Sequence, residues 1–187
     1  FTIVDPYVEG LPEDVALHRS ASELSGAFDV MLLGIKPQMV RELAGPILSL
    51  LAADATVISI LAGTEANTLS GHFPGRKILR LMPNLAAAIG ESPLAFFGAD
   101  AQQREAIANW FAPLGTTVWI ESEDQMNAVT ALAGSGPAFV YRFIDALAVA
   151  GAEIGLPAAI AAHLAMSTVK GAALLAAGAD ESPAKLA

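Results

Sequence analysis

The chain has 187 residues, a formal net charge of −9 and a hydrophobic content of 54%. The acidic balance argues against a nucleic-acid partner, because no basic stripe is present to neutralise phosphates. The absence of cysteine excludes disulfides, thiolate nucleophiles and thiolate metal sites, and the three histidines lack the spacing of a metal site. A chain without cysteine fits a cytoplasmic location, which we therefore expect.

The chain shows no uncharged apolar run of the ~18 residues that a membrane span needs. Residues 154–177 come closest, but Pro157, His163 and Lys170 interrupt them. We interpret this stretch as a buried or interface helix and expect no membrane partner. The chain opens on a strand-like run and stops just after a helix, so we expect a fragment cut at both ends.

The first elements are short. Residues 1–4 predict a strand, and residues 15–17 predict a second brief one after turn sequence. Ser20 has the chemistry of an N-cap for a helix over residues 21–27, with Glu23 completing a capping box.

A longer apolar run follows at residues 29–35, typical of a strand buried on both faces of a parallel sheet. Pro37 suits the first turn of the next helix, which we expect to reach about residue 53 with a kink at Pro46. A buried strand over residues 55–60 comes next, and Thr64 then caps a short helix.

The last strands are predicted at residues 77–82, 94–97 and 116–120, with a helix over residues 101–111 that Asp100 caps. Short apolar strands that alternate with helices indicate an α/β fold with a mainly parallel, Rossmann-like sheet.

The composition changes after residue 122, so we divide the chain into domains at 1–122 and 123–187. No strand signal remains, and two alanine-rich helices are predicted at residues 124–150 and 157–177. The second domain is all-helical and incomplete, because two such helices need more chain or a second subunit to cover their apolar faces. The first helix contains the sequence GSGP at residues 134–137. Proline and glycine inside a helix cost about 3 and 1 kcal/mol, which suggests close approach by a ligand or a partner helix.

Candidate binding residues follow three successive strands. In an open parallel sheet, ligands bind beyond the carboxyl ends of the strands. Residues 34–37, 59–63 and 82–84 occupy such ends and are rich in glycine, proline and small side chains. Lys36 has the charge to meet a phosphate, and Asn84 offers a donor and an acceptor to an amide. The alternative is that glycine and proline simply end these strands and that Lys36 is solvated.

Asp5 closes the first strand, where an acidic residue holds the adenosine ribose hydroxyls of NAD in the dinucleotide fold and repels a 2′-phosphate. The alternative is a turn aspartate before Pro6. The glycine-rich phosphate-binding turn that distinguishes the two readings is expected upstream of Phe1.

Four collinear motifs together resemble the Δ1-pyrroline-5-carboxylate reductase family. LGIKP at residues 33–37 is similar to the family's A-V-K-P, and SILAG at 59–63 to its S-x-A-A-G. RLMPN at 80–84 is similar to R-x-M-P-N, and LAGSGPAF at 132–139 to S-G-S-G-P-A-Y. The order and spacing continue downstream as far as residue 171, so the resemblance covers nearly the whole chain.

The resemblance implies a Rossmann domain followed by a helical domain that forms homodimers or larger homo-oligomers. It implies hydride transfer from NADPH or NADH to the C=N carbon of a cyclic imino acid, 1-pyrroline-5-carboxylate, which gives L-proline. Carried onto this chain, the cofactor-binding residues are Ser20, Gly34, Ile35, Lys36, Pro37, Ile60, Leu61, Ala62 and Asn84. Asp5, which the dinucleotide fold adds to this set, departs from the family, which often prefers NADPH and places hydroxyl or basic side chains in this region. The substrate side is Gly134, Ser135, Gly136 and Pro137. Imine reduction depends on positioning, so we expect no catalytic acid–base residue and no metal.

Two departures from the family bear on activity. The first strand with its glycine turn and the later S-P-G-G-T-T substrate motif do not occur in this sequence, so we expect the fragment to be inactive and an intact parent to be active. The alternatives are a β-hydroxyacid or prephenate dehydrogenase-like oxidoreductase, or an inactive cofactor-binding dimerisation fragment. Those dehydrogenases usually rely on a helical-domain lysine or histidine, whereas Lys170 follows no such motif.

Overall fold

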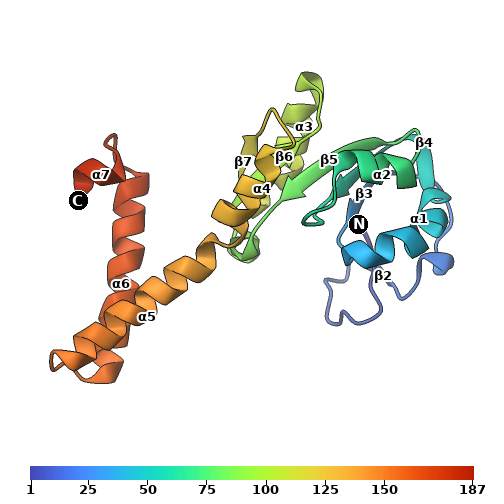
Figure 1. Cartoon of the computed structure of the whole chain (residues 1–187). Coiled ribbons are helices and arrows are strands. Elements are labelled where there is room, and N and C mark those ends of the chain that lie inside the picture. The colour runs from blue at the N-terminus through green and yellow to red at the C-terminus, as the bar shows by residue number, and fades with distance from the viewer. The chain divides into compact units, whose positions relative to one another are not determined.

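The computed structural model describes all residues, Phe1–Ala187. It divides into two compact units, a sheet-containing unit Phe1–Gly134 and a helical unit Ser135–Ala187. Figure 1 shows the elements of each unit. The segment after the compositional boundary at 122/123 belongs to the sheet-containing unit, because Met126 is buried there beside Met82 and Ala95.

The main sheet has five strands in the order β3-β4-β5-β6-β7. Neighbouring strands run parallel except β5 and β6, which are antiparallel. The predicted α/β fold with a mainly parallel sheet is therefore confirmed. The strands are β3 (Phe28–Leu33), β4 (Leu51–Ser59), β5 (Lys77–Met82), β6 (Ser92–Phe97) and β7 (Gly115–Trp119).

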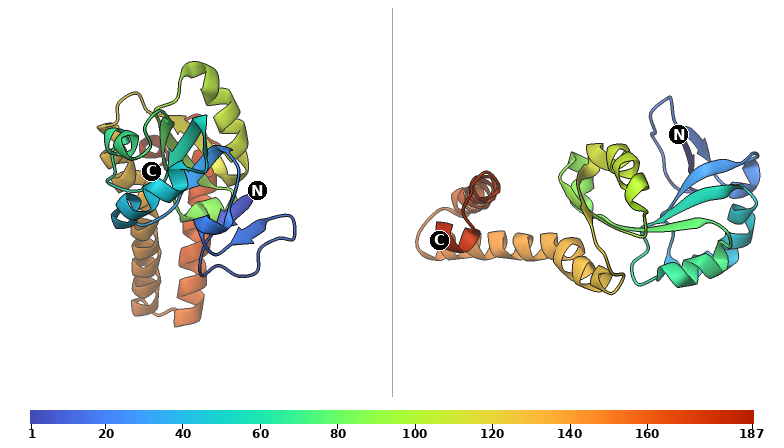
Figure 2. Two further views of the ribbon diagram at one scale, coloured as in Figure 1. Left: turned by 90° about the vertical axis from the view of Figure 1, so that its right-hand side faces the viewer. Right: turned by 90° about the horizontal axis from the view of Figure 1, so that it is seen from above.

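Helices cover both faces of this sheet. Successive side chains of a strand point to opposite faces, so a strand can pack against a helix layer on either side. Helices α1 (Val40–Leu48) and α2 (Ala66–His72) bury one face around Leu33 and Val57. Helix α3 (Ala101–Phe111) packs on the other face around Ile58 and Phe96. Figure 2 shows these two helical layers.

Strand β3 differs from the prediction of a strand buried on both faces. It is an edge strand, and Val30 and Leu32 are 41% and 54% exposed. The other face of β3 packs normally, since Leu33 is buried against α1. Val30 and Leu32 are exposed because α3, the helix on the same face of the sheet as Ile58, packs over β5 to β7 and does not reach β3. The apolar run alone could not predict where that helix would lie.

Helix α1 ends at Leu48, so the prediction of a helix to about residue 53 is wrong. Pro46 lies inside this helix and has no N–H to bond the carbonyl one turn earlier. The chain leaves the helix two residues later, and Leu51 starts β4 in register with Phe28. Burial of Leu51 stabilises the earlier start of the strand.

The N-terminal residues form a separate two-stranded parallel sheet of β1 (Thr2–Val4) and β2 (Ala16–His18). A single 3₁₀ turn, η1 (Ala21–Glu23), replaces the expected helix over residues 21–27. Ser20 caps this turn, but the capping box is wrong. The Glu23 carboxylate accepts from the backbone N–H of Arg19 at 3.2 Å, one residue before the cap.

The helix predicted over residues 124–150 is broken. Helix α4 (Gln125–Val129) passes into a π-helical turn, η5 (Thr130–Gly134), and α5 (Gly136–Glu153) begins anew. Pro137 lies in the first turn of α5, where its missing N–H has no helical partner to lose. The free-energy cost that was predicted for a proline inside a helix therefore does not apply to Pro137.

In the helical unit, α5 and α6 (Ala158–Ala177) form a hairpin that closes on small residues. A Cβ on Gly151 would lie 3.1 Å from the Cβ of Ala161. By length and composition alone α6 is apolar enough to cross a membrane, which is weak evidence because core helices of soluble proteins pass the same test. The remaining short elements are η2 (Pro37–Met39), η3 (Leu85–Ile89), η4 (Ala112–Leu114) and α7 (Pro183–Leu186).

Candidate functional site

The carboxyl ends of β3 and β4 meet at one edge of the sheet. The backbone N–H of Ile60 donates to the carbonyl oxygen of Leu33 at 3.2 Å. A Cβ built on Gly34 would lie 3.5 Å from the Cδ1 of Ile60. The structure thus brings together the first two predicted cofactor segments, residues 34–37 and 60–62.

The turn after β4 is held by the hydroxyl of Ser59. Ser59 is 1% exposed, and its Oγ accepts a hydrogen bond of 3.2 Å from the backbone N–H of Leu61. The Leu61 side chain is buried, whereas Ala62 and Gly63 are exposed. Gly63 has φ +69° and open space where a Cβ would lie. A flat ligand can therefore approach the backbone of this turn closely.

The segment after β3 begins a short 3₁₀ turn. Lys36 is its N-cap residue, and Pro37 occupies the first turn. Ile35 is half-buried, whereas the Lys36 side chain is exposed and forms no ion pair in the structure. Lys36 is thus free to act as a point charge beside the open backbone of Gly34.

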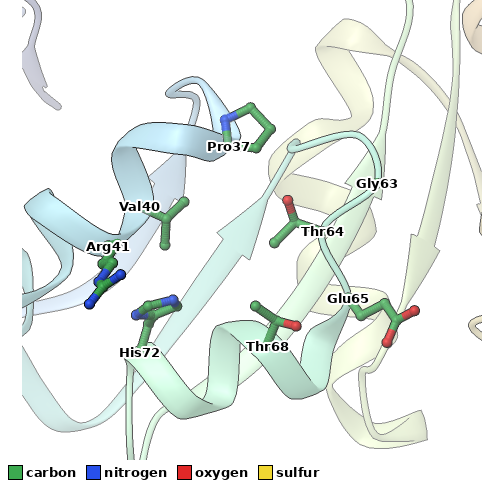
Figure 3. A pocket seen from close by; sticks show the side chains of 8 residues that line it. All are labelled: Pro37, Val40, Arg41, Gly63, Thr64, Glu65, Thr68 and His72. Atoms are coloured by element: carbon green, nitrogen blue, oxygen red, sulfur yellow. The ribbon is translucent and has the colours of Figure 1, made fainter.

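A cavity of about 400 Å³ opens between α1 and α2, beyond the ends of β3 and β4. Figure 3 shows Arg41 and His72 on its one side and Thr64, Glu65 and Thr68 on the other. Of the predicted cofactor residues only Pro37 lines it. The cavity therefore borders the candidate cofactor edge without containing it.

Asn84 lies two residues after the end of β5 and is the N-cap residue of η3, and its side chain is engaged within the protein. Its Oδ1 accepts from the backbone N–H of Ala86 at 2.9 Å, and its Nδ2 donates to the carbonyl oxygen of Ala133 at 3.0 Å. The Ser92 hydroxyl accepts from the Asn84 backbone N–H at 2.9 Å. One N–H and one lone pair of the amide remain for a ligand, so Asn84 is first a structural junction.

Asp5 holds a turn of its own loop. Its Oδ1 accepts from the backbone N–H groups of Tyr7 and Val8 at 2.7 and 2.9 Å. These two bonds lower the pKa of the Asp5 carboxyl below its usual value, and the positive charge of Arg19 contributes in the same direction. Arg19 fastens the loop further by donating to the carbonyl oxygens of Asp5 and Val8.

Asp5 and Ser20 follow the carboxyl ends of the paired strands β1 and β2, and the backbone N–H of Asp5 donates to the carbonyl oxygen of His18 at 3.0 Å. The Ser20 hydroxyl accepts from the backbone N–H of Ser22 at 3.2 Å and shares a hydrogen bond with the Ser22 hydroxyl. Ser20 is exposed.

An ion pair between Arg80 and Glu123 was not expected from the sequence. Arg80 is 4% exposed, and its Nη1 lies 2.9 Å from the Oε1 of Glu123. The same oxygen accepts from the backbone N–H of Ala66 at 2.7 Å.

The prediction that Thr64 caps α2 is wrong, since Glu65 is the N-cap residue and makes no side-chain bond there. Nothing in the local sequence marks Glu123 as the distant acceptor.

A second cavity of about 200 Å³ lies at this ion pair. It is lined by Gly63, Glu65, Arg80, Glu123, Asp124 and Asn127. The cavity lies between the turn after β4 and the start of α4. Of the predicted strand-end segments only Gly63 lines it, and none of the predicted binding residues does.

The small-residue motif at residues 134–137 spans the end of one unit and the start of the other. Gly134 ends η5, and a Cβ on it would lie 3.8 Å from the Sδ of Met82. Ser135 is the N-cap residue of α5, and Gly136 and Pro137 form its first turn. Gly134 thus lies beside the end of β5 in the sheet-containing unit.

A family model described as pyrroline-5-carboxylate reductase dimerisation matches residues 123–187. Three relatives, each named pyrroline-5-carboxylate reductase, come from Synechocystis sp., Glycine max and Methanosarcina acetivorans. They are 38%, 35% and 30% identical over 88%, 84% and 98% of this chain. The chain spans 62%, 58% and 70% of their respective lengths.

Solved structures of similar proteins agree with these relatives. A pyrroline-5-carboxylate reductase from Coxiella burnetii is 28% identical with a TM-score of 0.80, and that from Streptococcus pyogenes is 31% identical with a TM-score of 0.78. Each match covers 92% of this chain and 66% of the other. A pyrroline carboxylate reductase from Plasmodium falciparum, solved with NADP bound, shares the fold at 24% identity and a TM-score of 0.81, over 99% of this chain and 73% of its own.

Proposed function

Since the chain belongs to the pyrroline-5-carboxylate reductase family, we propose that it serves the reduction of 1-pyrroline-5-carboxylate to L-proline, the last step of proline biosynthesis. The chain spans about three-fifths of the length of the soybean and Synechocystis relatives. The observation that carries the proposal is the shared edge of β3 and β4, where Ile60 bonds the Leu33 carbonyl and the open turns of both strands meet.

The proposed cofactor is NADP or NAD, whose reduced nicotinamide supplies the hydride when bound. The residues at this edge fit such a ligand, because Gly34, Ala62 and Gly63 leave the backbone accessible and Lys36 adds an uncommitted positive charge. The main contacts are assigned to residues 34–37 and 60–62, with the remaining amide groups of Asn84 beside them. Asp5 and Ser20 are assigned to the adenosine ribose.

The proposed substrate side is the segment Gly134, Ser135, Gly136 and Pro137. Small residues there let a ring approach the backbone. The chain's part in the reaction is to bind and orient the imine and to exclude water, which accounts for much of the rate of such a hydride transfer. We assign no general acid or base and no metal.

We further propose that the chain forms homodimers through its helical residues. No residue of α5 is buried, and α6 buries only Ala161 and Ala165. The family match to a dimerisation model supports this assignment. The functional division is proposed at 122/123, where the cofactor part ends and that match begins. A cytoplasmic location, with neither membrane nor nucleic acid as partner, remains a prediction.

Oxidation of NADPH or NADH in the presence of pyrroline-5-carboxylate tests the proposal, followed by the absorbance of the reduced nicotinamide. Proline formation at the rate of cofactor oxidation supports it. Turnover of a β-hydroxy acid or prephenate with NAD⁺ instead identifies a dehydrogenase of another class. Fluorescence titration with each dinucleotide separates an inactive cofactor-binding chain, which binds without turnover, from one that binds neither.

A further inference from the structure

We propose that Glu123 is a positioning residue that holds the turn after β4 in place, and with it one wall of the cofactor edge. The inference rests on the proposed function for its consequence, but the contacts that carry it lie wholly within the sheet-containing unit. One carboxylate oxygen of Glu123, which lies two residues before α4, joins Arg80 of β5 to the first residue of α2, Ala66.

The turn after β4 is fastened at both of its ends by side-chain oxygens. The buried Ser59 hydroxyl accepts from the backbone N–H of Leu61 at 3.2 Å. Glu123 accepts from the backbone N–H of Ala66 at 2.7 Å. The residues between these two bonds include Ala62, which is assigned to the cofactor, and Gly63, which has φ +69°. Glycine restricts its own backbone less than other residues do, so the two end contacts are what constrains this turn.

The N–H of Ala66 needs an acceptor because the first N–H groups of a helix have no partner within it. Ser, Thr, Asp or Asn usually supplies one at the N-cap. Here the N-cap is Glu65, whose side chain makes no cap bond. Glu123 supplies the acceptor from 57 residues later in the chain.

Arg80 fixes the position of the Glu123 carboxylate. Arg80 is 4% exposed and precedes the strand end at Met82, and its Nη1 lies 2.9 Å from Glu123. Such a charge-assisted hydrogen bond is stronger and more directional than a neutral one. Arg80 pairs with Ser59 in the ladder of β4 and β5. The ion pair therefore ties the start of α2, where the turn after β4 ends, to the sheet at the position where that turn begins.

A residue that served only stability would behave differently from a positioning residue, and two substitutions separate the roles. Glu123→Gln keeps an oxygen that can accept from Ala66 but loses the charge opposite Arg80. Glu123→Ala loses both. Glu121→Ala is the matched control, because Glu121 lies on the same segment and pairs with Arg104, but its side chain is 76% exposed and contacts no part of the turn.

The experiment measures amide hydrogen exchange at Ala66, thermal unfolding and dinucleotide binding for each full-length variant. Both Glu123 variants are expected to unfold at lower temperature. Exchange at Ala66 is expected to accelerate about 10- to 100-fold in Glu123→Ala, the range for losing a hydrogen bond to a charged group, and to stay near the wild-type rate in Glu123→Gln. NADPH should bind Glu123→Ala more weakly than it binds Glu123→Gln, with Glu121→Ala unchanged.

The proposal is overturned if the Ala66 amide exchanges at the same rate in Glu123→Ala as in the wild type. It is also overturned if this amide loses its protection from exchange equally in Glu123→Gln and Glu123→Ala. If Glu123→Ala does not fold, the double variant Arg80→Met/Glu123→Ala removes the buried charge left without a partner and gives the same exchange comparison. Amide hydrogen exchange at Ala66 tests whether Glu123 positions the turn. Titration of the wild-type chain with NADPH and NADH tests separately whether the chain binds the cofactor. Either one can therefore fail without the other.

Discussion

The side-chain Nδ2 of Asn84 donates a hydrogen bond of 3.0 Å to the carbonyl oxygen of Ala133, 49 residues later in the chain. Ala133 lies in the π-helical turn η5, where the widened backbone leaves a carbonyl available to an outside donor. This bond links the strand-end motif at residues 80–84 to the small-residue motif at 132–139. Asn84 and the first part of the small-residue motif, up to Gly134, form one structural junction within the sheet-containing unit.

Asn84→Ala should lower the free energy of unfolding by about 1–3 kcal/mol, because it removes a helix cap and leaves the Ala133 carbonyl without its donor. Urea unfolding at equilibrium measures the change. Asn84→Asp keeps the acceptor for Ala86 but loses the donor, so it should show part of the loss. Leu85→Ala is the control, since Leu85 is 80% exposed. Equal stability of all three variants and the wild type would contradict the junction.

Pro137→Ala should change the free energy of unfolding by less than about 1 kcal/mol and slightly lower it, because proline restricts the unfolded chain. A proline in mid-helix costs about 3 kcal/mol, so its removal there would stabilise the protein. Pro46 lies inside α1 and is the matched comparison. Pro46→Ala should raise stability, whereas Pro137→Ala should not. Stabilisation by both to the same extent would place Pro137 in a helix interior.

The sequence predicted elements well where a local pattern decides the outcome. The strand at residues 77–82 and the helix at 101–111 have the bounds that were predicted, because apolar runs and turn residues mark their ends. The edges of β3 and β4 that meet at Leu33 and Ile60 followed from the rule for parallel strands.

Contacts between distant residues could not be predicted in this way. Glu123 caps α2 from 57 residues away, and nothing near Thr64 or Glu65 signals that acceptor. The break at Gly134 was also missed, since small residues fit either one long helix or a π turn followed by a second helix. The contact of Glu123 with the start of α2 and the helix break at Gly134 both depend on which elements pack together. The pattern of apolar residues along the chain does not contain that information.

The turn at Asp5 should depend on pH in a defined direction. Hydrogen bonds from Tyr7 and Val8, and then the charge of Arg19, lower the pKa of the Asp5 carboxyl. A lowered pKa means that the turn is stabilised above the unfolded value, about pH 4, and loses that stabilisation as the pH falls through the folded value. Exchange of the Tyr7 amide should therefore show extra opening only below about pH 4. Asp5→Asn should abolish this dependence, and an unchanged profile would contradict the assignment.

Asp5 should also influence cofactor choice. Its Oδ1 takes both backbone bonds, which leaves Oδ2 to accept from the ribose hydroxyls and to repel a 2′-phosphate. We expect NADH to bind at least as well as NADPH, and Asp5→Ser to improve NADPH binding relative to NADH. Fluorescence titrations of wild type and variant with both dinucleotides measure this ratio. A strong wild-type preference for NADPH would refute the role given to Asp5.

The stripe of Phe139, Phe143 and Leu147 on α5 should mediate self-association. These residues recur every four positions and so share one helix face, and they are 72%, 58% and 37% exposed. In a two-fold dimer each change occurs twice across the interface, so Phe143→Glu should convert a dimer into a monomer at micromolar protein concentration.

Sedimentation equilibrium of both proteins measures this change. Asp145→Ala is the matched control, because Asp145 lies on the same helix in an exposed pair with Arg142 and its loss should leave the dimer intact. A wild-type chain that is monomeric at micromolar concentration, or a Phe143→Glu variant that remains a dimer, would show that these apolar side chains have another role.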